Sequence, residues 1–531
     1  MTKPPLSAKP QTGLAGLIEN WRSDLQSGLL VFLIALPLCL GISVASGFPP
    51  TAGIITAIIG GVLVSRISGS YLTINGPAAG LIVVVLAAVQ ALGEGDAMAG
   101  YRYTLAAIVL ASVLQVLLGA FKLGQLSSFF PTSVVHGMLA AIGIIIIATQ
   151  THVMLGITPE PGSLFSIIAQ IPHSLLNMNT EIALISFLSL LILIIWPLIG
   201  SRIPAPVIVV LVGIVFAWHF NLAQEQAAGG SKFVVGIPDD FMAGFYFPDF
   251  SKMTTIAFWE AVLSISLVGS LESLLSATAV DKLDPYKRRS DLDRDLTAVG
   301  IGNLLAGLIG GLPMIAEIVR SSANINNGAK TAWANFFHGL ILLLFVVLFT
   351  GFIRSIPLAC LAALLVYTGY RLASPETFYR VRDVGKEQLF IFVVTIIGVL
   401  ATDLLIGVAF GIIVKLAVNM ARGVWPDNLF KIHFTIQQQD NETLIIKLLG
   451  SALFSNFLPL RKALVNLDKG KTIIFDFSEG YLIDHTVMEF IHDYRQNYEA
   501  EGGQCRKLGK ALETFSNHVL AARLMTADDR K

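Results

Sequence analysis

The sequence predicts a polytopic α-helical membrane protein followed by a small cytosolic α/β domain. Hydrophobic residues make up 54% of the 531-residue chain and charged residues only 14%, whereas a water-soluble chain carries about 25% charged residues. Apolar segments of about 20 residues, the length that crosses a bilayer, recur up to residue 422. The formal net charge of zero argues against a nucleic-acid partner, because such proteins present an excess of basic residues.

The apolar segments fall into two series of seven. The first series predicts spans at 25–46, 50–68, 77–92, 101–121, 133–150, 180–199 and 205–220. The second predicts spans at 254–279, 293–311, 315–327, 331–350, 353–370, 386–402 and 404–422. The third member of each series is short. Because seven is odd, the two series enter the membrane from opposite sides, so we expect 14 spans arranged as 7+7 inverted repeats.

Basic residues predict the orientation in the cytoplasmic (inner) membrane. Positive charge concentrates in cytoplasmic connections, and the loops after the eighth and twelfth spans hold Lys282, Lys287, Arg288, Arg289, Arg294, Arg371, Arg380, Arg382 and Lys386. Both termini are therefore expected in the cytoplasm. We expect residues 1–24, which are polar and include Lys3, Lys9 and Arg22, to form a flexible or interfacial arm before a transmembrane domain at residues 25–424.

From residue 425 the pattern changes to that of a separate domain, residues 425–531. Residues 431–436, 443–448 and 472–477 alternate or run apolar as strands do, while 454–466, 484–500 and 510–524 have helical spacing. This alternation predicts a mixed sheet with helices on one face.

The tenth predicted span contains polar and charged residues, which are costly inside a bilayer and usually serve a function there. Gly310 and Pro313 interrupt the chain just before Glu317 and Arg320, which predicts an extended segment and then a short helix that begins near Ile315. The N–H groups at such a helix end carry partial positive charge. Together with Arg320, they suit a small anion.

The third predicted span has the same design. A β-prone run at residues 71–74 leads through Asn75 and Gly76 to Pro77, which is suited to the first position of a helix. Two interrupted spans at corresponding positions predict a transport site where their ends meet, so Pro77 and Ile315 should lie close together. Small residues would let an anion reach backbone N–H groups, although Ala79 and Gly80 can instead serve close helix packing. The predicted substrate-binding residues are Asn75, Gly76, Ala78, Ala79, Ala316, Glu317 and Arg320.

Three charged residues in these spans each allow more than one role. Arg320 can be the fixed positive charge beside the anion, or it can form a structural ion pair with Glu317. Glu317 would repel an anion unless it is protonated, paired or bound to a cation, which favours cation-coupled symport; the alternative is capping of the short helix. Glu272, in the middle of an apolar span, can carry a coupling proton, share one with Glu317, or be a buried structural acid.

These motifs resemble those of the SulP family of inorganic anion transporters, which includes sulfate permeases, cyanobacterial bicarbonate carriers and prestin. The matching segments are Asn75-Gly-Pro-Ala78, Gly269-Ser-Leu-Glu-Ser-Leu-Leu-Ser276 and Ile318-Val-Arg-Ser-Ser-Ala-Asn324 with Gly328. The resemblance implies core and gate domains with half-helices 3 and 10, an elevator-like movement, a homodimer and a C-terminal STAS domain. In that domain His485 stands where bacterial relatives often have a phosphorylatable Ser, which leaves Thr486 as a candidate acceptor.

The resemblance also implies a cation site. In the bicarbonate carriers an Asp and a Thr at the positions of Glu272 and Ser276 hold sodium. A sodium ion is therefore the one cofactor expected, and a structural metal is not expected. Relatives that carry sulfate often read Pro-Gln-x-x-x-Tyr in the first span, where this chain reads Pro37-Leu-Cys-Leu-Gly-Ile42. That departure favours a smaller anion such as bicarbonate.

The expected function is therefore secondary-active transport of bicarbonate or sulfate, driven by sodium or protons. The alternatives are a nucleobase permease of the same fold, a passive anion channel or exchanger, and a voltage-responsive membrane motor. An enzyme is not expected, because no nucleophile, base and orienting group form a recognisable set. Cys39, Cys360 and Cys505 are too widely spaced to suggest a disulfide framework or a metal site.

Overall fold

The computed structural model describes residues 9–124, 130–159, 163–200, 203–227, 233–238, 241–440, 442–465, 467, 470–500, 502–508, 513–514 and 516–524. The chain forms two compact units, one of residues 1–124 and 142–371 and the other of residues 125–141 and 372–531. The first unit is helical, whereas the second combines helices with a six-stranded sheet.

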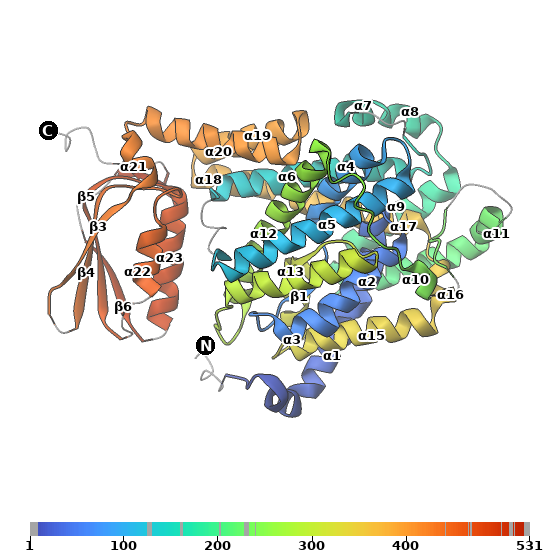
Figure 1. Ribbon diagram of the computed structural model, residues 1–531, viewed down its shortest axis with the longest axis horizontal. Coiled ribbons are helices and arrows are strands. Elements are labelled where there is room, and N and C mark those ends of the chain that lie inside the picture. Colours follow the sequence, from blue (N-terminus) through green and yellow to red (C-terminus); the bar gives the residue numbers. More distant parts are fainter. Residues whose placement is uncertain are drawn as a thin grey trace. The chain divides into compact units, whose positions relative to one another are not determined.

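The first half of the helical unit carries α1 (Gly13–Ala45), α2 (Pro50–Ile59), a π-helical turn (Gly60–Val64), α3 (Ser65–Ile67), β1 (Ile74–Pro77), a 3₁₀ turn (Ala79–Leu81), α4 (Ile82–Gly93), α5 (Ala97–Ala120), α7 (Leu164–Ala169), α8 (Ile171–Leu176), α9 (Thr180–Ile195) and α10 (Ala205–His219). α6 (Thr132–Met154) begins in the second unit and ends in the first. The second half carries α11 (Leu222–Ala227), α12 (Ile256–Leu283), α13 (Leu292–Ile309), β2 (Met314–Glu317), α14 (Ile318–Asn326), α15 (Trp333–Leu348), α16 (Thr350–Arg354) and α17 (Leu358–Leu372). In Figure 1, α1 lies along α15 and α5 lies along α13, so helices far apart in sequence are neighbours.

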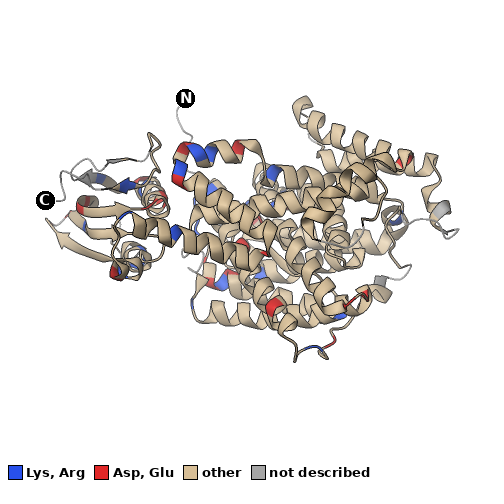
Figure 2. Cartoon of the chain, turned by 90° about the horizontal axis from the view of Figure 1, so that it is seen from above, with Lys and Arg blue, Asp and Glu red and all other residues tan. Residues whose placement is uncertain are grey.

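Every predicted span contains a helix. Among the described residues, eight helical segments are long and apolar enough to cross a membrane, and shorter apolar helices include α10 and α15. Charged residues are absent from long stretches of the helices (Figure 2). The chain is therefore a polytopic helical membrane protein, while the count of 14 crossings stays a prediction.

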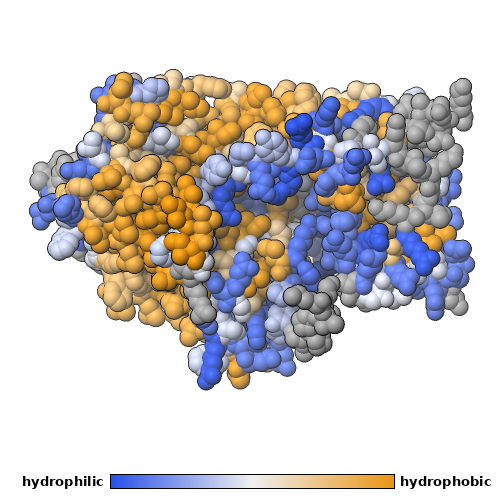
Figure 3. Space-filling view, turned by 180° about the vertical axis from the view of Figure 1, so that it is seen from behind, coloured by the Kyte–Doolittle hydropathy of each residue, from blue (hydrophilic) through white to orange (hydrophobic). Residues whose placement is uncertain are grey.

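Large apolar side chains are exposed on the helical unit, as lipid contact requires. Phe187 and Ile194 on α9 are 67% and 58% exposed, and Trp218 on α10 is 84% exposed. Figure 3 shows apolar residues gathered over a broad part of one face of the molecule. Side chains of this size would be buried in a water-soluble domain.

The flexible alternative for the N-terminal arm is wrong over residues 13–24, because α1 begins at Gly13. The interfacial alternative stays a prediction, and residues 1–8 lie outside the described part of the chain. Asn20 and Asp24 are buried because they face the unit's interior. Asp24 Oδ1 accepts hydrogen bonds from the backbone N–H groups of Lys330 and Thr331, at 2.8 and 3.2 Å.

The second unit contains α18 (Pro375–Val384), α19 (Lys386–Ala401), α20 (Leu404–Ala421) and α21 (Pro426–Phe430), followed by the α/β part. That part carries β3 (His433–Gln438), β4 (Thr443–Ala452), α22 (Leu458–Val465), β5 (Thr472–Ile483), α23 (His485–Ala500), β6 (Gln504–Leu508), β7 (Glu513–Thr514) and β8 (Arg523–Leu524). The strand order is β3-β4-β5-β8-β7, with β6 also paired to β5. β4 and β6 run parallel to β5, while β3 and β8 run antiparallel to their partners, so the sheet is mixed as expected.

α22 and α23 cover one face of this sheet (Figure 1). Leu460 from α22 and Ile491 from α23 pack in one core with Ile446 and Phe475 from the strands. The helix predicted at residues 510–524 is wrong, because residues 513–514 and 523–524 form a short antiparallel strand pair; residues 509–512 lie outside the described part. Helical spacing of apolar residues in so short a segment does not outweigh pairing with an existing sheet edge.

Candidate functional site

The two interrupted spans meet as a pair of strands. β1 pairs antiparallel with β2, with Asn75 opposite Ala316 and Gly76 opposite Ile315. Both strands are buried apart from a partly exposed Glu317. Pairing satisfies backbone groups that would be costly if left free at membrane depth. The predicted proximity of Pro77 and Ile315 is therefore present, since the residues lie on facing strands.

The details of each interrupted span differ from the prediction. α14 begins at Ile318, three residues after the predicted start at Ile315, because Met314 to Glu317 pair with β1. Pro77 is the last residue of β1 and not the first residue of a helix; a 3₁₀ turn begins at Ala79 and α4 at Ile82. The helix-starting propensity of Pro77 is outweighed by the ladder that β1 and β2 form together.

Arg320 lies across β1 with its guanidinium fully buried. One terminal nitrogen, Nη2, donates to the carbonyl oxygen of Pro77 at 3.1 Å, and the other, Nη1, donates to the Sγ atom of Cys39 at 3.5 Å. Its Nε atom has no hydrogen-bond partner in the described part of the chain. A Cβ atom at Gly76 would lie 2.6 Å from Nη1. Glycine at this position therefore leaves room for the guanidinium.

Glu317 acts as the N-cap residue of α14. Its Oε2 accepts a long hydrogen bond of 3.5 Å from the backbone N–H of Arg320, so the capping role that the sequence left open is present. Within the described residues the structure gives no ion pair between the two side chains. The positive charge of Arg320 is thus held by neutral groups, which leaves it able to attract a substrate anion.

Glu272 lies on α12 and is 6% exposed. Its carboxylate packs against Gly80, where a Cβ atom would come within 1.8 Å of Oε1. Oε1 has no hydrogen-bond partner among the residues that the structure describes. α12 packs against β2 and α14, so Glu272 and Glu317 lie on neighbouring elements that together form one acidic region.

Ser276 lies four residues after Glu272 on the same helix and is also buried. Residues at this spacing lie on the same helix face, so the two oxygen-bearing side chains fit the type of ligand that sodium takes. Among the described residues, no cluster of three His, Cys, Asp or Glu side chains could hold a metal ion. The fit to sodium therefore depends on the carboxylate, the hydroxyl and backbone oxygens.

Three polar residues that sequence reasoning missed hold β2 in place. Asn303 on α13 accepts from Met314 N at 2.6 Å and donates to Met314 O at 3.1 Å. Ser273 on α12 accepts from Ala316 N at 3.2 Å, and Thr56 on α2 donates to the Leu312 carbonyl at 2.8 Å. Their signal in the sequence was a polar residue within a predicted membrane span, which needs a partner when buried.

A second polar group surrounds Asn75. Its Oδ1 accepts from Asn335 Nδ2 on α15 at 3.1 Å. Asn75 Nδ2, Asn335 Oδ1 and both ring nitrogens of His338 are buried without a hydrogen-bond partner among the described residues. Such unpaired atoms are uncommon in folded proteins, and here they lie where α15 meets β1.

The structure brings together most of the predicted site. Ala78 and Ala79 are buried at the start of the third span, next to the strand that carries Asn75 and Gly76. Asn324 serves the backbone, because its Nδ2 donates to the Leu72 carbonyl at 3.0 Å. Cys39 is the contact of Arg320 that the sequence did not suggest.

Comparison with known proteins places these features in a wider group. The chain matches a family model described as the sulfate permease family over residues 21–395. It is 25% identical to the putative sulfate transporter YvdB of Bacillus subtilis, over 93% of this chain and 92% of the relative. It is 26% identical to the bicarbonate transporter BicA of a Picosynechococcus species, over 76% of this chain and 71% of the relative.

Two solved structures have a similar fold. The transmembrane domain of a cyanobacterium bicarbonate transporter BicA gives a TM-score of 0.65 at 23% identity, and it covers 73% of this chain and 97% of its own. The murine Slc26a9 anion transporter in the inward-facing state gives a TM-score of 0.67 at 18% identity, covering 95% of this chain and 90% of its own. At these identities the likeness concerns the fold.

Proposed function

The chain belongs to the sulfate permease family, and we propose that it is a secondary-active transporter of a small inorganic anion, bicarbonate or sulfate, across the cytoplasmic membrane. The observation that carries this proposal is the buried Arg320 at the junction of β1 and β2. Its guanidinium contacts a carbonyl and a thiol, and no carboxylate neutralises it within the described residues. A buried charge without a counter-ion is costly, and a bound anion would supply the missing partner.

The surroundings of Arg320 suit an anion of few atoms. α14 begins at Ile318 and carries Arg320 in its first turn, so its helix dipole would add positive potential at the same end. Gly76, Ala78, Ala79 and Ala316 contribute no bulk on the facing strands and turn. Oxyanions are held by backbone N–H groups and by guanidinium hydrogen bonds.

Glu272 and Ser276 would supply the site for the coupling cation. A carboxylate with an unpartnered buried oxygen can take up a proton or contribute a ligand to sodium, and either neutralises the acidic region shared with Glu317. The neutralised state favours binding of the anion, because uncompensated carboxylates repel it. Coupling follows from that mutual dependence, since each ligand improves the site for the other.

Bicarbonate is the substrate we favour. The first span contributes Leu38 and Ile42 where sulfate carriers often have a Gln and a Tyr, and Ile42 is buried. This span also places Cys39 against Arg320. A site with fewer polar groups satisfies fewer oxygens, so it would favour the anion with the smaller charge and fewer oxygens.

The larger arrangement belongs to the same proposal. Fourteen spans, core and gate domains with elevator-like movement, both termini in the cytoplasm and a homodimer would agree with the inverted series of helices and with the fold of the similar transporters. The α/β part at residues 425–531 would be a STAS domain. In that domain Asp484 caps α23 through Val487 N at 2.9 Å, and Thr486 is the second residue of the helix.

Uptake into proteoliposomes tests the proposal. Labelled bicarbonate and labelled sulfate would be offered separately, each under an imposed sodium gradient, an imposed pH gradient or neither. We expect bicarbonate to accumulate above its equilibrium level only when one of the two gradients is present. Equal flux without a gradient would indicate a passive channel or exchanger, and inhibition of uptake by uracil would indicate a nucleobase permease.

A further inference from the structure

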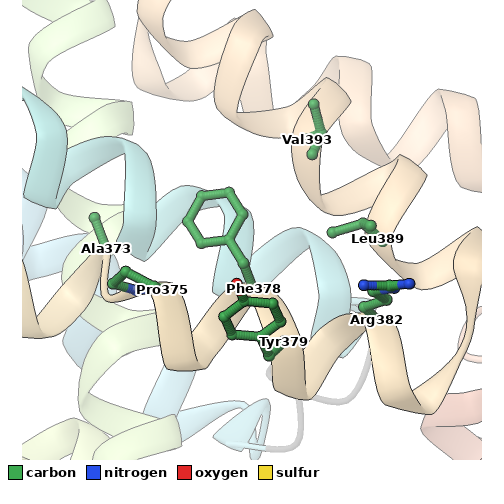
Figure 4. Close-up of a pocket in the computed structure, with 7 residues that line it drawn as sticks. All are labelled: Ala373, Pro375, Phe378, Tyr379, Arg382, Leu389 and Val393. Carbon is green, nitrogen blue, oxygen red and sulfur yellow. The ribbon is translucent and has the colours of Figure 1, made fainter.

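The helices α18 and α19 enclose an apolar pocket that the anion site does not use. It has a volume of 470 Å³ and is lined by Ala373, Pro375, Phe378, Tyr379, Arg382, Leu389 and Val393. Figure 4 shows Phe378 projecting from α18 into the space that Leu389 and Val393 border from α19. Phe378 packs edge-on against Phe392 with ring centroids 4.8 Å apart, so one wall of the pocket is fixed by aromatic packing.

The pocket lies beside an exposed apolar surface of α19. Phe390 and Ile397, on the same helix as Leu389 and Val393, are 53% and 59% exposed, which is the exposure of a bilayer-facing helix surface. Tyr379 is 62% exposed at the pocket, and a tyrosine with an apolar ring and a polar tip is typical of the membrane interface. The pocket can therefore receive an acyl chain from the bilayer without crossing water.

Positive charge lies at the rim of the pocket. Arg382 is its one charged lining residue, and Lys386 begins α19 close by in sequence. The nearby acids are engaged elsewhere: Glu376 pairs with Arg380 at 3.1 Å, and Glu387 pairs with Lys415 at 2.6 Å and with Arg422. Asp383 is exposed beside Arg382. Within the described residues, Arg382 and Lys386 have no ion pair of their own.

We propose that the pocket between α18 and α19 binds a phospholipid with an anionic headgroup, whose acyl chain lies among Phe378, Leu389 and Val393 and whose phosphate is bound by Arg382. An apolar pocket with a basic rim is complementary to such a lipid at both ends, and basic pockets between membrane helices bind anionic headgroups. α18 connects α17 to α19, so the lipid would hold this connecting helix at the membrane surface.

Native mass spectrometry of the full-length protein tests the assignment. Phosphatidylglycerol and phosphatidylcholine with identical acyl chains would be titrated onto wild type, Arg382→Gln, Val393→Phe and the control Arg380→Gln. Arg380 is the matched control because it lies on the same helix, outside the pocket lining, and is already paired with Glu376. We expect saturable binding of phosphatidylglycerol about fivefold tighter than of phosphatidylcholine, the effect of roughly one basic residue near a lipid surface.

The variants separate the two halves of the site. Arg382→Gln should remove the preference for phosphatidylglycerol, Val393→Phe should weaken binding of both lipids by filling the pocket, and Arg380→Gln should behave as wild type. Equal binding of the two lipids by wild type, or an unchanged preference in Arg382→Gln, would overturn the proposal. Displacement of phosphatidylglycerol by soluble glycerol phosphate would also overturn it, because the site would then recognise free phosphate.

Discussion

At the scale of single residues, the main feature of the candidate anion site is the buried charge of Arg320, whose hydrogen-bond partners are neutral. Arg320 is fully buried, yet its contacts are the carbonyl of Pro77 and the thiol of Cys39. Sequence reasoning left open an ion pair with Glu317, but Glu317 instead caps α14. This difference matters because an internal pair would have neutralised the guanidinium, whereas its contacts among the described residues are to neutral groups.

Replacing Arg320 by alanine should abolish transport. Losing a charge-assisted contact to the anion corresponds to about 2 to 3 kcal/mol, or roughly a 100-fold fall in uptake. Initial uptake rates in proteoliposomes measure this, with elution volume and Tm as folding checks. Arg289→Ala, at an exposed loop residue, is the matched control. Full uptake by a folded Arg320→Ala would show that the anion does not bind at Arg320.

Glu272→Gln should uncouple transport from its driving cation. Glutamine keeps the size of the side chain but cannot bind a proton and is a poorer sodium ligand. Uptake by this variant should no longer rise when a sodium or pH gradient is imposed. If stimulation by the gradient matched that of wild type, the coupling site would lie elsewhere.

Gly80→Ala should perturb the same carboxylate without removing it. A Cβ atom at residue 80 would lie 1.8 Å from Glu272 Oε1, so the side chain must move away from the start of the third span. We expect at least a tenfold higher cation concentration for half-maximal uptake, a shift of about 1.4 kcal/mol. Gly351→Ala is the control, since nothing lies within 4 Å of a Cβ atom there, and its cation dependence should stay that of wild type.

At the scale of elements, the strand pair β1–β2 is held by side chains from three helices. Asn303, Ser273 and Thr56 bond to backbone atoms at or just before β2. Neither strand is long enough to be stable by itself, since a two-stranded pair is marginal even in water. The helices therefore determine where the strands lie, and the strands determine where Arg320 and the N-terminus of α14 lie.

Asn303→Leu should destabilise this arrangement. It leaves Met314 N and O without their side-chain partner and removes a 2.7 Å hydrogen bond to Gln115. Unsatisfied buried groups of this kind cost roughly 2 to 4 kcal/mol in total, which should appear as a lower Tm together with reduced uptake. Asn177→Leu, at an exposed residue just after α8, is the comparison, and an equal fall in Tm for both would argue against a specific role.

The sequence predicted the elements of the site better than their conformation. Gly310, Pro313 and the Asn75 to Pro77 segment indicated two broken spans, because glycine and proline there stand beside polar residues that an unbroken apolar helix would not carry. The corresponding positions of the two broken spans indicated their proximity. They did not indicate a ladder, since each broken segment pairs only with a strand more than 200 residues away. The same limit explains the wrong helix at 510–524, where pairing between β7 and β8 outweighed local spacing.

At the scale of the whole molecule, the strand pair bears on how the chain crosses the membrane. The helix at Ala79–Gly93 is about 22 Å long at 1.5 Å per residue, shorter than a hydrocarbon core of about 30 Å. The four residues of β1 add about 13 Å at 3.3 Å per residue. Strand and helix together are therefore long enough to make one crossing, which an isolated short helix would not be.

The connection after the third span and the long middle connection lie on the same side of the first unit, as that crossing requires. Lys252 Nζ pairs with Glu94 Oε1 at 2.8 Å, so the connection after the third span and the long middle connection lie on the same side, and the Lys252 ammonium lowers the pKa of Glu94. The loop after the eighth span instead gathers basic residues, which are retained in the cytoplasm. The two sets of connections should then lie on opposite sides of the membrane.

Labelling of an introduced cysteine measures this directly. Met98 is 47% exposed at the start of α5, and Arg289 is exposed in the basic loop. Met98→Cys should react with a membrane-impermeant maleimide in intact cells, while Arg289→Cys should react only after the membrane is opened. Background should be low, because Cys39, Cys360 and Cys505 are all buried. Labelling of Met98→Cys only after the membrane is opened would mean that β1 and the helix after it do not make a crossing. The two series would then not be inverted, and the strand ends would not face a common path for the anion.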